Sequence, residues 1–178
     1  MAPYPVYMTG KAPQSIDAAV LLPLYGWPDD EPGLLFTERP ADMRRHAGEI
    51  SFPGGRRDPE DADLSATALR EAQEEIGLDP AAVELGEELP PTNTFVTGYR
   101  IHPFVGRIPH PRELDLRPNP AEVETVLTFS LPVLRESYEI RRLIRRGVPI
   151  HTPTYEVDGH LIWGATARIL ADLLDRLD

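Results

Sequence analysis

The chain has no cysteine among its 178 residues. This absence excludes disulfide bonds, a thiolate nucleophile and zinc held by cysteine. The sequence also lacks the G-x-S-x-G elbow of serine hydrolases. No apolar run approaches the ~20 residues of a membrane span, and the N-terminus lacks the charged and then apolar order of a signal peptide. We therefore expect a cytoplasmic protein that does not act on a membrane.

Lysine is almost absent too, and acidic residues outnumber basic ones, which gives a net charge of −11 at pH 7. This charge argues against nonspecific binding to nucleic acid or to an anionic membrane. The length suits a single domain, residues 1–178, that buries about 70% of its unfolded surface. A small molecule is therefore the expected partner, and the oligomeric state stays open.

The most informative stretch is REAQEEIGL, residues 70–78. On a helix it gathers Glu71, Glu74 and Glu75 within one turn, about 5–6 Å apart between Cβ atoms, directly behind Arg70. Carboxylates this close repel one another unless a cation joins them. Clustered oxygen donors suit Mg²⁺ or Mn²⁺, which keep several waters while they bind substrate phosphates. The stretch therefore indicates a divalent metal site in which Arg70 positions Glu74, and the alternative is a solvated acidic helix face.

Glycines frame this acidic helix. Gly54 and Gly55 precede it and allow main-chain groups to approach a ligand closely. An acidic, proline-containing loop follows, and the helix is expected to start near Leu64 and to stop at Gly77. The unit is thus a glycine turn, a loop, an acidic helix and a glycine stop.

This unit resembles the signature of the Nudix hydrolases, in which a glycine and an acidic loop precede R-E-apolar-x-E-E-x-G-apolar. The matching residues are Gly55, Arg70, Glu71, Ala72, Glu74, Glu75, Gly77 and Leu78. The chain departs from the signature in two respects, since the loop is one residue longer than the common spacing and Asp61 stands where glutamate is usual. The resemblance implies an α/β fold of the Nudix type, an α/β/α sandwich with a mixed β-sheet.

A second segment, residues 34–55, is similar to an additional motif of the coenzyme A pyrophosphatase branch of that family. The residues at its positions are Leu35, Thr37, Arg39, Arg44, Gly48, Phe52, Pro53, Gly54 and Gly55, while Pro40 departs from it. Residues 118–126 and 160–170 also resemble this branch. The resemblance implies hydrolysis of the diphosphate of coenzyme A, which yields 4′-phosphopantetheine and adenosine 3′,5′-bisphosphate.

The resemblance also implies roles for particular residues. The metal, Mg²⁺ or Mn²⁺, would be held by Glu71, Glu75 and Glu74 together with the main-chain carbonyl of Gly55. Family members commonly take a base from outside the signature, and Glu122 is the candidate here, with Glu124 second. Both could equally be exposed strand residues.

Basic residues concentrate beside the glycine turn, where guanidinium groups suit a substrate with several phosphates. The candidate substrate-binding residues are Arg39, Arg44, Arg45, His46, Arg56 and Arg57. Taken singly, each arginine could be an ordinary surface residue. A further basic stretch, YEIRRLIRRG at residues 138–147, could be a helix or a strand, and we expect a solvated face there before a substrate or partner contact.

Hydrophobic periodicity and turn residues predict an α/β pattern, with a mixed sheet between helical layers. The expected strands are Ile16–Leu24, Gly33–Arg39, Glu49–Phe52, Ala82–Leu85, Ile101–Ile108 and Val123–Phe129. A hairpin is expected at Thr154–Trp163, with its turn at Asp158 and Gly159, and a closing helix at Ala165–Leu177.

Three functions remain open at this point. The first is a coenzyme A pyrophosphatase. The second is a Nudix enzyme for ADP-ribose, NADH or another nucleoside diphosphate derivative. The third is a catalytically silent Nudix-fold sensor, against which the presence of Arg70 and all three signature glutamates argues.

Overall fold

The computed structural model describes residues 15–26, 31–42, 48–94, 98–111, 114–145 and 147–177. The main sheet, in chain order, comprises β1 (Ile16–Tyr25), β2 (Gly33–Glu38), β3 (Ile50–Ser51), β4 (Gly54–Arg56), β5 (Glu84–Glu88), β6 (Thr92–Asn93), β7 (Tyr99–Ile108) and β8 (Thr125–Ser130). A smaller sheet comprises β9 (Tyr138–Arg145), β10 (Val148–Val157) and β11 (His160–Ile162). The helices are α1 (Leu64–Ile76), the short 3₁₀ helix η1 (Pro80–Ala82), α2 (Leu131–Glu136) and α3 (Gly164–Arg176).

The main sheet is mixed, as the sequence predicted. Its central strands β1 and β7 run parallel along their full lengths, from Ile16 beside Tyr99 to Tyr25 beside Ile108. The other pairings in this sheet are antiparallel, and the principal order is β3-β2-β1-β7-β5. Strand β8 returns beside β2, and the short β4 pairs with β1. The α/β class with a mixed sheet is therefore confirmed.

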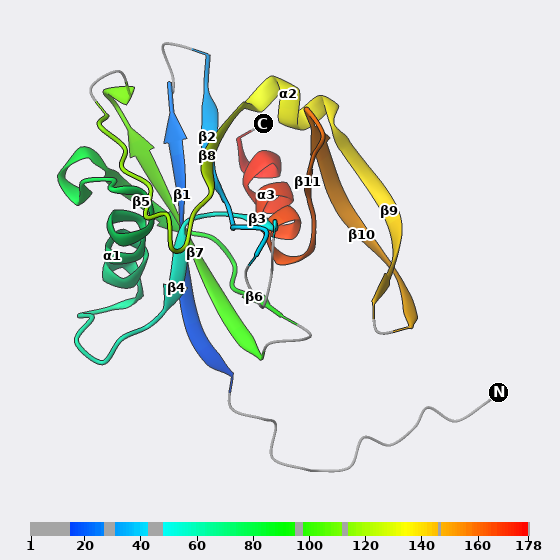
Figure 1. Ribbon diagram of the computed structural model, residues 1–178, viewed down its shortest axis with the longest axis horizontal. Coiled ribbons are helices and arrows are strands. Elements are labelled where there is room, and N and C mark those ends of the chain that lie inside the picture. The colour runs from blue at the N-terminus through cyan, green and yellow to red at the C-terminus, as the bar shows by residue number, and fades with distance from the viewer. Residues whose placement is uncertain are drawn as a thin grey trace.

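Helices cover both faces of the main sheet, with α1 on one side and α3 on the other (Figure 1). Alternation along β1 explains this arrangement, because successive strand residues point to opposite faces. Ala19 and Leu21 pack against the apolar residues of α1, whereas Leu22 and Leu24 pack with α3. The smaller sheet lies beyond α3 and contributes Tyr155 to that second core.

Each boundary of α1 has a local cause. The Asp63 side chain accepts a hydrogen bond from the Ala66 main-chain N–H at 2.8 Å, which caps the start of the helix. Gly77 ends the helix with φ +69° and donates its N–H to the last carbonyls. The helix therefore starts at Leu64 and stops at Gly77, as predicted.

The predicted turn of the β10–β11 hairpin is also confirmed. Asp158 and Gly159 have φ of 52° and 82°, and they connect Val157 to its cross-strand partner His160. Positive φ at both central residues is the geometry that favours Asp-Gly in two-residue hairpin loops.

Other boundaries differ from the predicted ones. The strand expected at Ala82–Leu85 begins at Glu84, because Asp79 caps the short 3₁₀ helix at Pro80–Ala82. Neither β4, whose two glycines disfavour a strand, nor α2 was predicted from the sequence. The basic stretch left open between helix and strand forms β9. No helix in the described ranges is long and apolar enough to cross a membrane.

Candidate active site

The glycine turn brings β4 against the middle of β1. Gly54 pairs with Val20 and Gly55 with Ala19. A Cβ atom on Gly54 would lie 2.3 Å from the main-chain oxygen of Ala19, and one on Gly55 would lie 2.4 Å from the carboxylate of Glu71. Glycine is thus required at position 54, where a Cβ atom would meet the backbone of β1, whereas a Cβ atom at position 55 would displace the carboxylate of Glu71.

Glu75 is the most deeply buried of the three signature glutamates, with 5% of its surface exposed. Its carboxylate accepts a hydrogen bond from the Gly54 main-chain N–H at 3.2 Å. Burial raises the pKa of Glu75 to about 7, and the negative charges of Glu71 and Glu122 act in the same direction. Arg39 acts in the opposite direction, so the charges of Glu71, Glu122 and Arg39 all influence the Glu75 carboxylate.

Glu71 is partly buried beside Glu75, whereas Glu74 stands in solvent. Burial raises the pKa of Glu71, and the ion pair with Arg70, 2.9 Å from its carboxylate, partly offsets this rise. The side chain of Glu74 is 56% exposed and binds Arg70 at 3.0 Å. The structure therefore brings Glu71 and Glu75 to the glycine turn and leaves Glu74 at its margin.

Arg70 ties the loop before α1 to the helix. Its guanidinium donates to both carboxylate oxygens of Asp61, at 2.9 and 3.0 Å, and to the main-chain carbonyl of Arg56 at 3.1 Å. This pairing lowers the pKa of Asp61 well below its usual range. Thr67 donates to the same carboxylate at 2.8 Å. Asp61 is thus the main partner of Arg70, a role that the sequence analysis did not assign to it.

The segment after Arg117 closes over the C-terminal end of α1. The main-chain N–H of Asn119 donates to the carbonyl of Glu75 at 2.8 Å. The Asn119 side-chain amide then donates to the carboxylate of Glu122 at 3.3 Å, and its carbonyl oxygen accepts from the N–H of Ala121 at 3.1 Å. Asn119 therefore joins the helix that carries Glu75 to the turn that carries Glu122, while Glu124 is exposed. The sequence signal that could have identified Asn119 is its place between Pro118 and Pro120, where a turn is expected.

The predicted arginines divide into three groups. Arg39 follows β2, and its Nε is buried with no hydrogen-bond partner in the described structure. Arg56 and Arg57 are exposed, and the Arg57 guanidinium donates to the carbonyls of Asp61 and Ala62 in the loop. The other predicted residues, Arg44, Arg45 and His46, lie outside the described residues.

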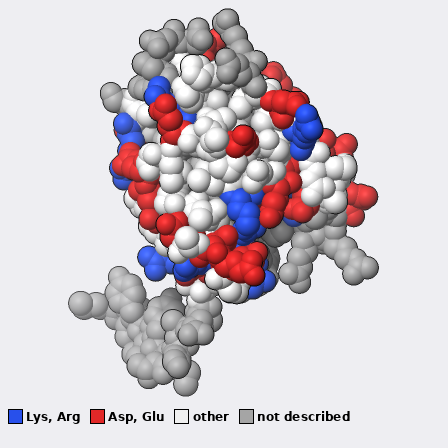
Figure 2. Space-filling view, turned by 90° about the vertical axis from the view of Figure 1, so that its left-hand side faces the viewer, with Lys and Arg blue, Asp and Glu red and all other residues white. Residues whose placement is uncertain are grey.

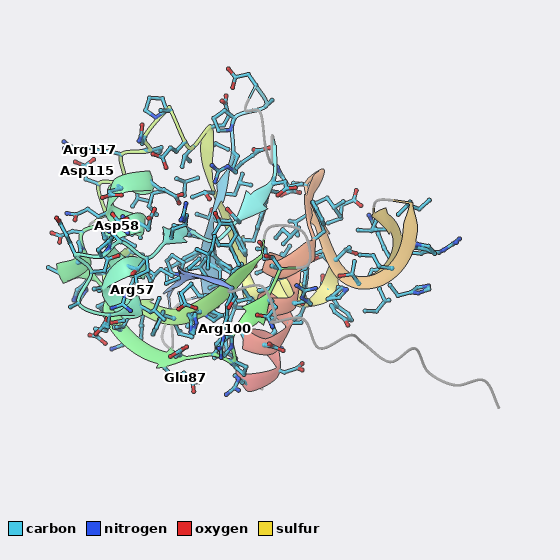
Figure 3. All side chains as sticks on the ribbon, turned by 90° about the horizontal axis from the view of Figure 1, so that it is seen from below. Arg57, Asp58, Glu87, Arg100, Asp115 and Arg117 are labelled. Atoms are coloured by element: carbon cyan, nitrogen blue, oxygen red, sulfur yellow. The ribbon has the colours of Figure 1, made fainter. Side chains whose placement is uncertain are left out.

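Acidic and basic groups share the α1 side of the molecule, with the acidic groups in excess (Figure 2). Arg57 and Asp58 lie on this side together with the ion pair formed by Asp115 and Arg117 (Figure 3). The site is therefore bordered by charged groups of both signs.

The donors at this site fit a divalent cation only in part. Among the described residues, no three carboxylates or imidazoles are close enough to enclose a metal ion by themselves. Glu71 and Glu75 are nevertheless desolvated carboxylates of like charge, and burial has raised the pKa of each. Mg²⁺ is usually held by one or two carboxylates together with waters and substrate phosphates, which matches a two-glutamate site better than a closed protein cage.

The fold and the site together define a Nudix-type protein. Residues 18–146 match the model of the NUDIX domain, and the chain therefore belongs to the Nudix family. The uncharacterized Nudix hydrolase NudL of Salmonella dublin is 41% identical over 171 residues, which cover 93% of this chain and 85% of the relative. The NudL of Cronobacter sakazakii is 42% identical over 161 residues, which cover 88% and 80% respectively.

Solved structures share the same fold at low identity. A MutT/nudix family protein from Enterococcus faecalis superposes with a TM-score of 0.62 at 15% identity, covering 99% of this chain and 65% of that protein. The NUDIX domain of Shewanella oneidensis NrtR, crystallised with ADP ribose, gives a TM-score of 0.59 at 14% identity, covering 93% and 90%. These similarities confirm the Nudix fold.

Proposed function

We propose that the protein is a metal-dependent pyrophosphatase that cleaves the diphosphate of coenzyme A or its derivatives. The observation that carries the chemistry is the buried Glu75 carboxylate, held by the Gly54 N–H and faced by Glu71 and Glu122. The similarity of residues 34–55 to the motif of the coenzyme A pyrophosphatase branch supports coenzyme A as the substrate. Mg²⁺ or Mn²⁺ between Glu71 and Glu75 would neutralise the phosphate oxygens and lower the pKa of an attacking water.

The residues of the chain supply positioning and proton transfer. Arg70 holds Glu71 in place through the ion pair at 2.9 Å. Asn119 orients the carboxylate of Glu122, which is the proposed general base and accepts a proton from the attacking water. The water oxygen bonds to one phosphorus as the bond from that phosphorus to the bridging oxygen breaks, and the second phosphate departs with the bridging oxygen.

The buried Nε of Arg39 supports an anionic substrate. An arginine donor that is buried without a partner is costly, and a phosphate oxygen would satisfy it with a charge-assisted bond. Arg39 also lies close enough to Glu75 to lower the pKa of its carboxyl group. A phosphate bound near Glu75 would therefore gain a cationic donor from Arg39.

A panel of substrates with Mg²⁺ and with Mn²⁺ tests this proposal. Coenzyme A should be cleaved to 4′-phosphopantetheine and adenosine 3′,5′-bisphosphate, with a higher kcat/KM than 3′-dephospho-coenzyme A, ADP-ribose or NADH. Equal kcat/KM for coenzyme A and its dephospho form would reject the coenzyme A assignment and favour the broader Nudix pyrophosphatase. Binding without any hydrolysis would favour the nucleotide sensor.

Replacement of Arg39 by glutamine is expected to raise KM for coenzyme A about tenfold, because it removes a charge-assisted bond to phosphate, while kcat falls less. Steady-state kinetics measure both constants. The matched control is Arg107→Gln at the β5–β7 edge, where the arginine pairs with Glu84 away from the glycine turn. If both variants gave the same KM as the unmodified protein, Arg39 would have no part in substrate binding.

Replacement of Asn119 by alanine is expected to lower kcat about tenfold and to change KM less than about twofold, because it releases Glu122 without removing a substrate contact. The variant Asn119→Asp distinguishes the orientation of Glu122 by Asn119 from the contribution of Asn119 to the turn. Aspartate keeps an oxygen for the Ala121 N–H but loses the donor to Glu122. Should the aspartate variant keep full kcat, Asn119 would act only as a turn residue.

A further inference from the structure

The β9–β10 hairpin forms an arm that projects from the body of the molecule (Figure 1). Strand β11 pairs with β10 only at Tyr155–Val157, so in the described residues the rest of the arm is two strands wide. Two-stranded hairpins have little stability of their own in water. The outer part of the arm is therefore the part that a further strand would stabilise most.

The arm concentrates exposed apolar side chains. The described residues contain seven exposed large hydrophobic side chains, and four of them lie on this hairpin. They are Tyr138 (49% exposed), Ile140 (51%), Ile144 (71%) and Ile150 (37%). Because strand residues alternate between faces, Tyr138, Ile140 and Ile144 share one face of β9. Arg142 lies between Ile140 and Ile144 on this face, and exposed apolar side chains concentrated on one hairpin in this way indicate an interaction surface.

The arm also carries a shallow apolar hollow of about 270 Å³, lined by Leu143, Ile144, Leu161 and Trp163. The exposed Ile144 therefore stands at the rim of an apolar hollow that Leu161 of β11 and Trp163 complete. Such neighbouring features suit an interface around a two-fold axis, because each surface patch must fit its own copy.

Strand β9 offers a free edge for such a contact. It is the outer strand of the small sheet and pairs, within the described residues, with β10 alone. Edge strands with unpaired main-chain groups are templates for pairing with another strand. An apolar patch beside a free edge on a projecting arm favours strand addition over the docking of a globular surface.

The sequence of β9 is complementary to itself when it is read antiparallel. If Ile140 faces Ile144 of a second copy, this apolar pair occurs twice because of the two-fold symmetry, and apolar cross-strand pairs stabilise a sheet. Arg142 then faces its own copy at the axis, as the single like-charge pair of this register.

We propose that the β9–β10 arm is a homodimerisation element, in which the β9 strands of two copies pair antiparallel around a two-fold axis. The two small sheets then form one six-stranded sheet across the dimer. Ile140 and Ile144 of the two copies then pack side by side, and the outer part of each arm gains a third strand. This proposal is independent of the proposed function.

The absence of cysteine from the chain allows a direct test. Directly opposed residues of an antiparallel pair have Cα atoms about 4.5–5.5 Å apart, within the range of a disulfide. Under mild oxidation, Arg142→Cys should form a covalent dimer, whereas Glu87→Cys on β5 should remain monomeric on a non-reducing gel. Light scattering of the unmodified chain should give twice the mass of one chain.

Ile144→Asp should raise the dimer dissociation constant at least about tenfold. Leu85→Asp, at a side chain 40% exposed on β5, is the matched control and should leave the dissociation constant unchanged. Thermal unfolding of both variants checks that they fold. A monomeric unmodified chain, a dimer that survives Ile144→Asp, no cross-link at position 142, or equal cross-linking of both cysteine variants would each overturn the proposal.

Discussion

Replacement of Glu75 by glutamine is expected to lower kcat for coenzyme A about 10²–10³-fold. The substitution keeps the volume of the side chain and an oxygen for the Gly54 N–H, but it removes the charge that would hold the metal. Without the metal, the negative charge that develops on the diphosphate oxygens in the transition state is no longer neutralised. Initial rates over a range of Mg²⁺ concentrations measure the effect.

The control for this variant is Glu60→Gln, an exposed carboxylate in the loop before α1. It carries the same change of charge and should keep almost full kcat. If Glu75→Gln hydrolysed the substrate at an undiminished rate, Glu75 would have no catalytic role. If both variants lost activity, the lower kcat would result from the change in net charge and not from the position of Glu75. Comparison with Glu74→Gln, at a side chain that is 56% exposed, would show how far the margin of the site contributes.

The metal-free protein is expected to lose stability as the pH rises from about 4.5 to about 7. Glu75 has an ordinary pKa of 4.5, and burial raises it to about 7 in the folded protein. Between these values the unfolded chain has released the proton that the folded chain still binds, so the free energy of unfolding falls with increasing pH. The full difference amounts to about 3 kcal/mol above pH 7.

Thermal unfolding in a chelator at pH 5 and pH 8 measures this difference. Glu75→Gln has no proton to release, so its melting temperature should depend less on pH and should exceed that of the unmodified protein at pH 8. Mg²⁺ should raise the melting temperature of the unmodified protein more than that of the variant. An identical pH dependence in both proteins would mean that Glu75 is not the titrating group.

The acidic helix could be predicted closely because its signals are local. Asp63 and Gly77 set its two ends through hydrogen bonds within a few residues of the chain. The Asp-Gly turn at residue 158 was predictable for the same reason, since its positive φ depends on the residue type. Local chemistry of this kind is legible in a sequence without any knowledge of what packs around it.

Features that depend on distant contacts could not be predicted in this way. Strand β4 consists of Gly54, Gly55 and Arg56, and it exists because β1 supplies its hydrogen-bond partners. The contact between the Glu75 carboxylate and the Gly54 N–H is also tertiary, since the two residues are 21 positions apart in the chain. The role of Asn119 likewise arises from its contact with the far end of α1.

The last turn of α1 is a junction of three segments that are remote in the sequence. The Gly54 N–H binds the Glu75 carboxylate, and the Asn119 N–H binds the Glu75 carbonyl. Glu75 thus connects β4, α1 and the loop that carries Asn119, so a displacement of any one of these segments disturbs the other two. Substitutions at the junction should therefore be tolerated less well than substitutions in the exposed loops outside it.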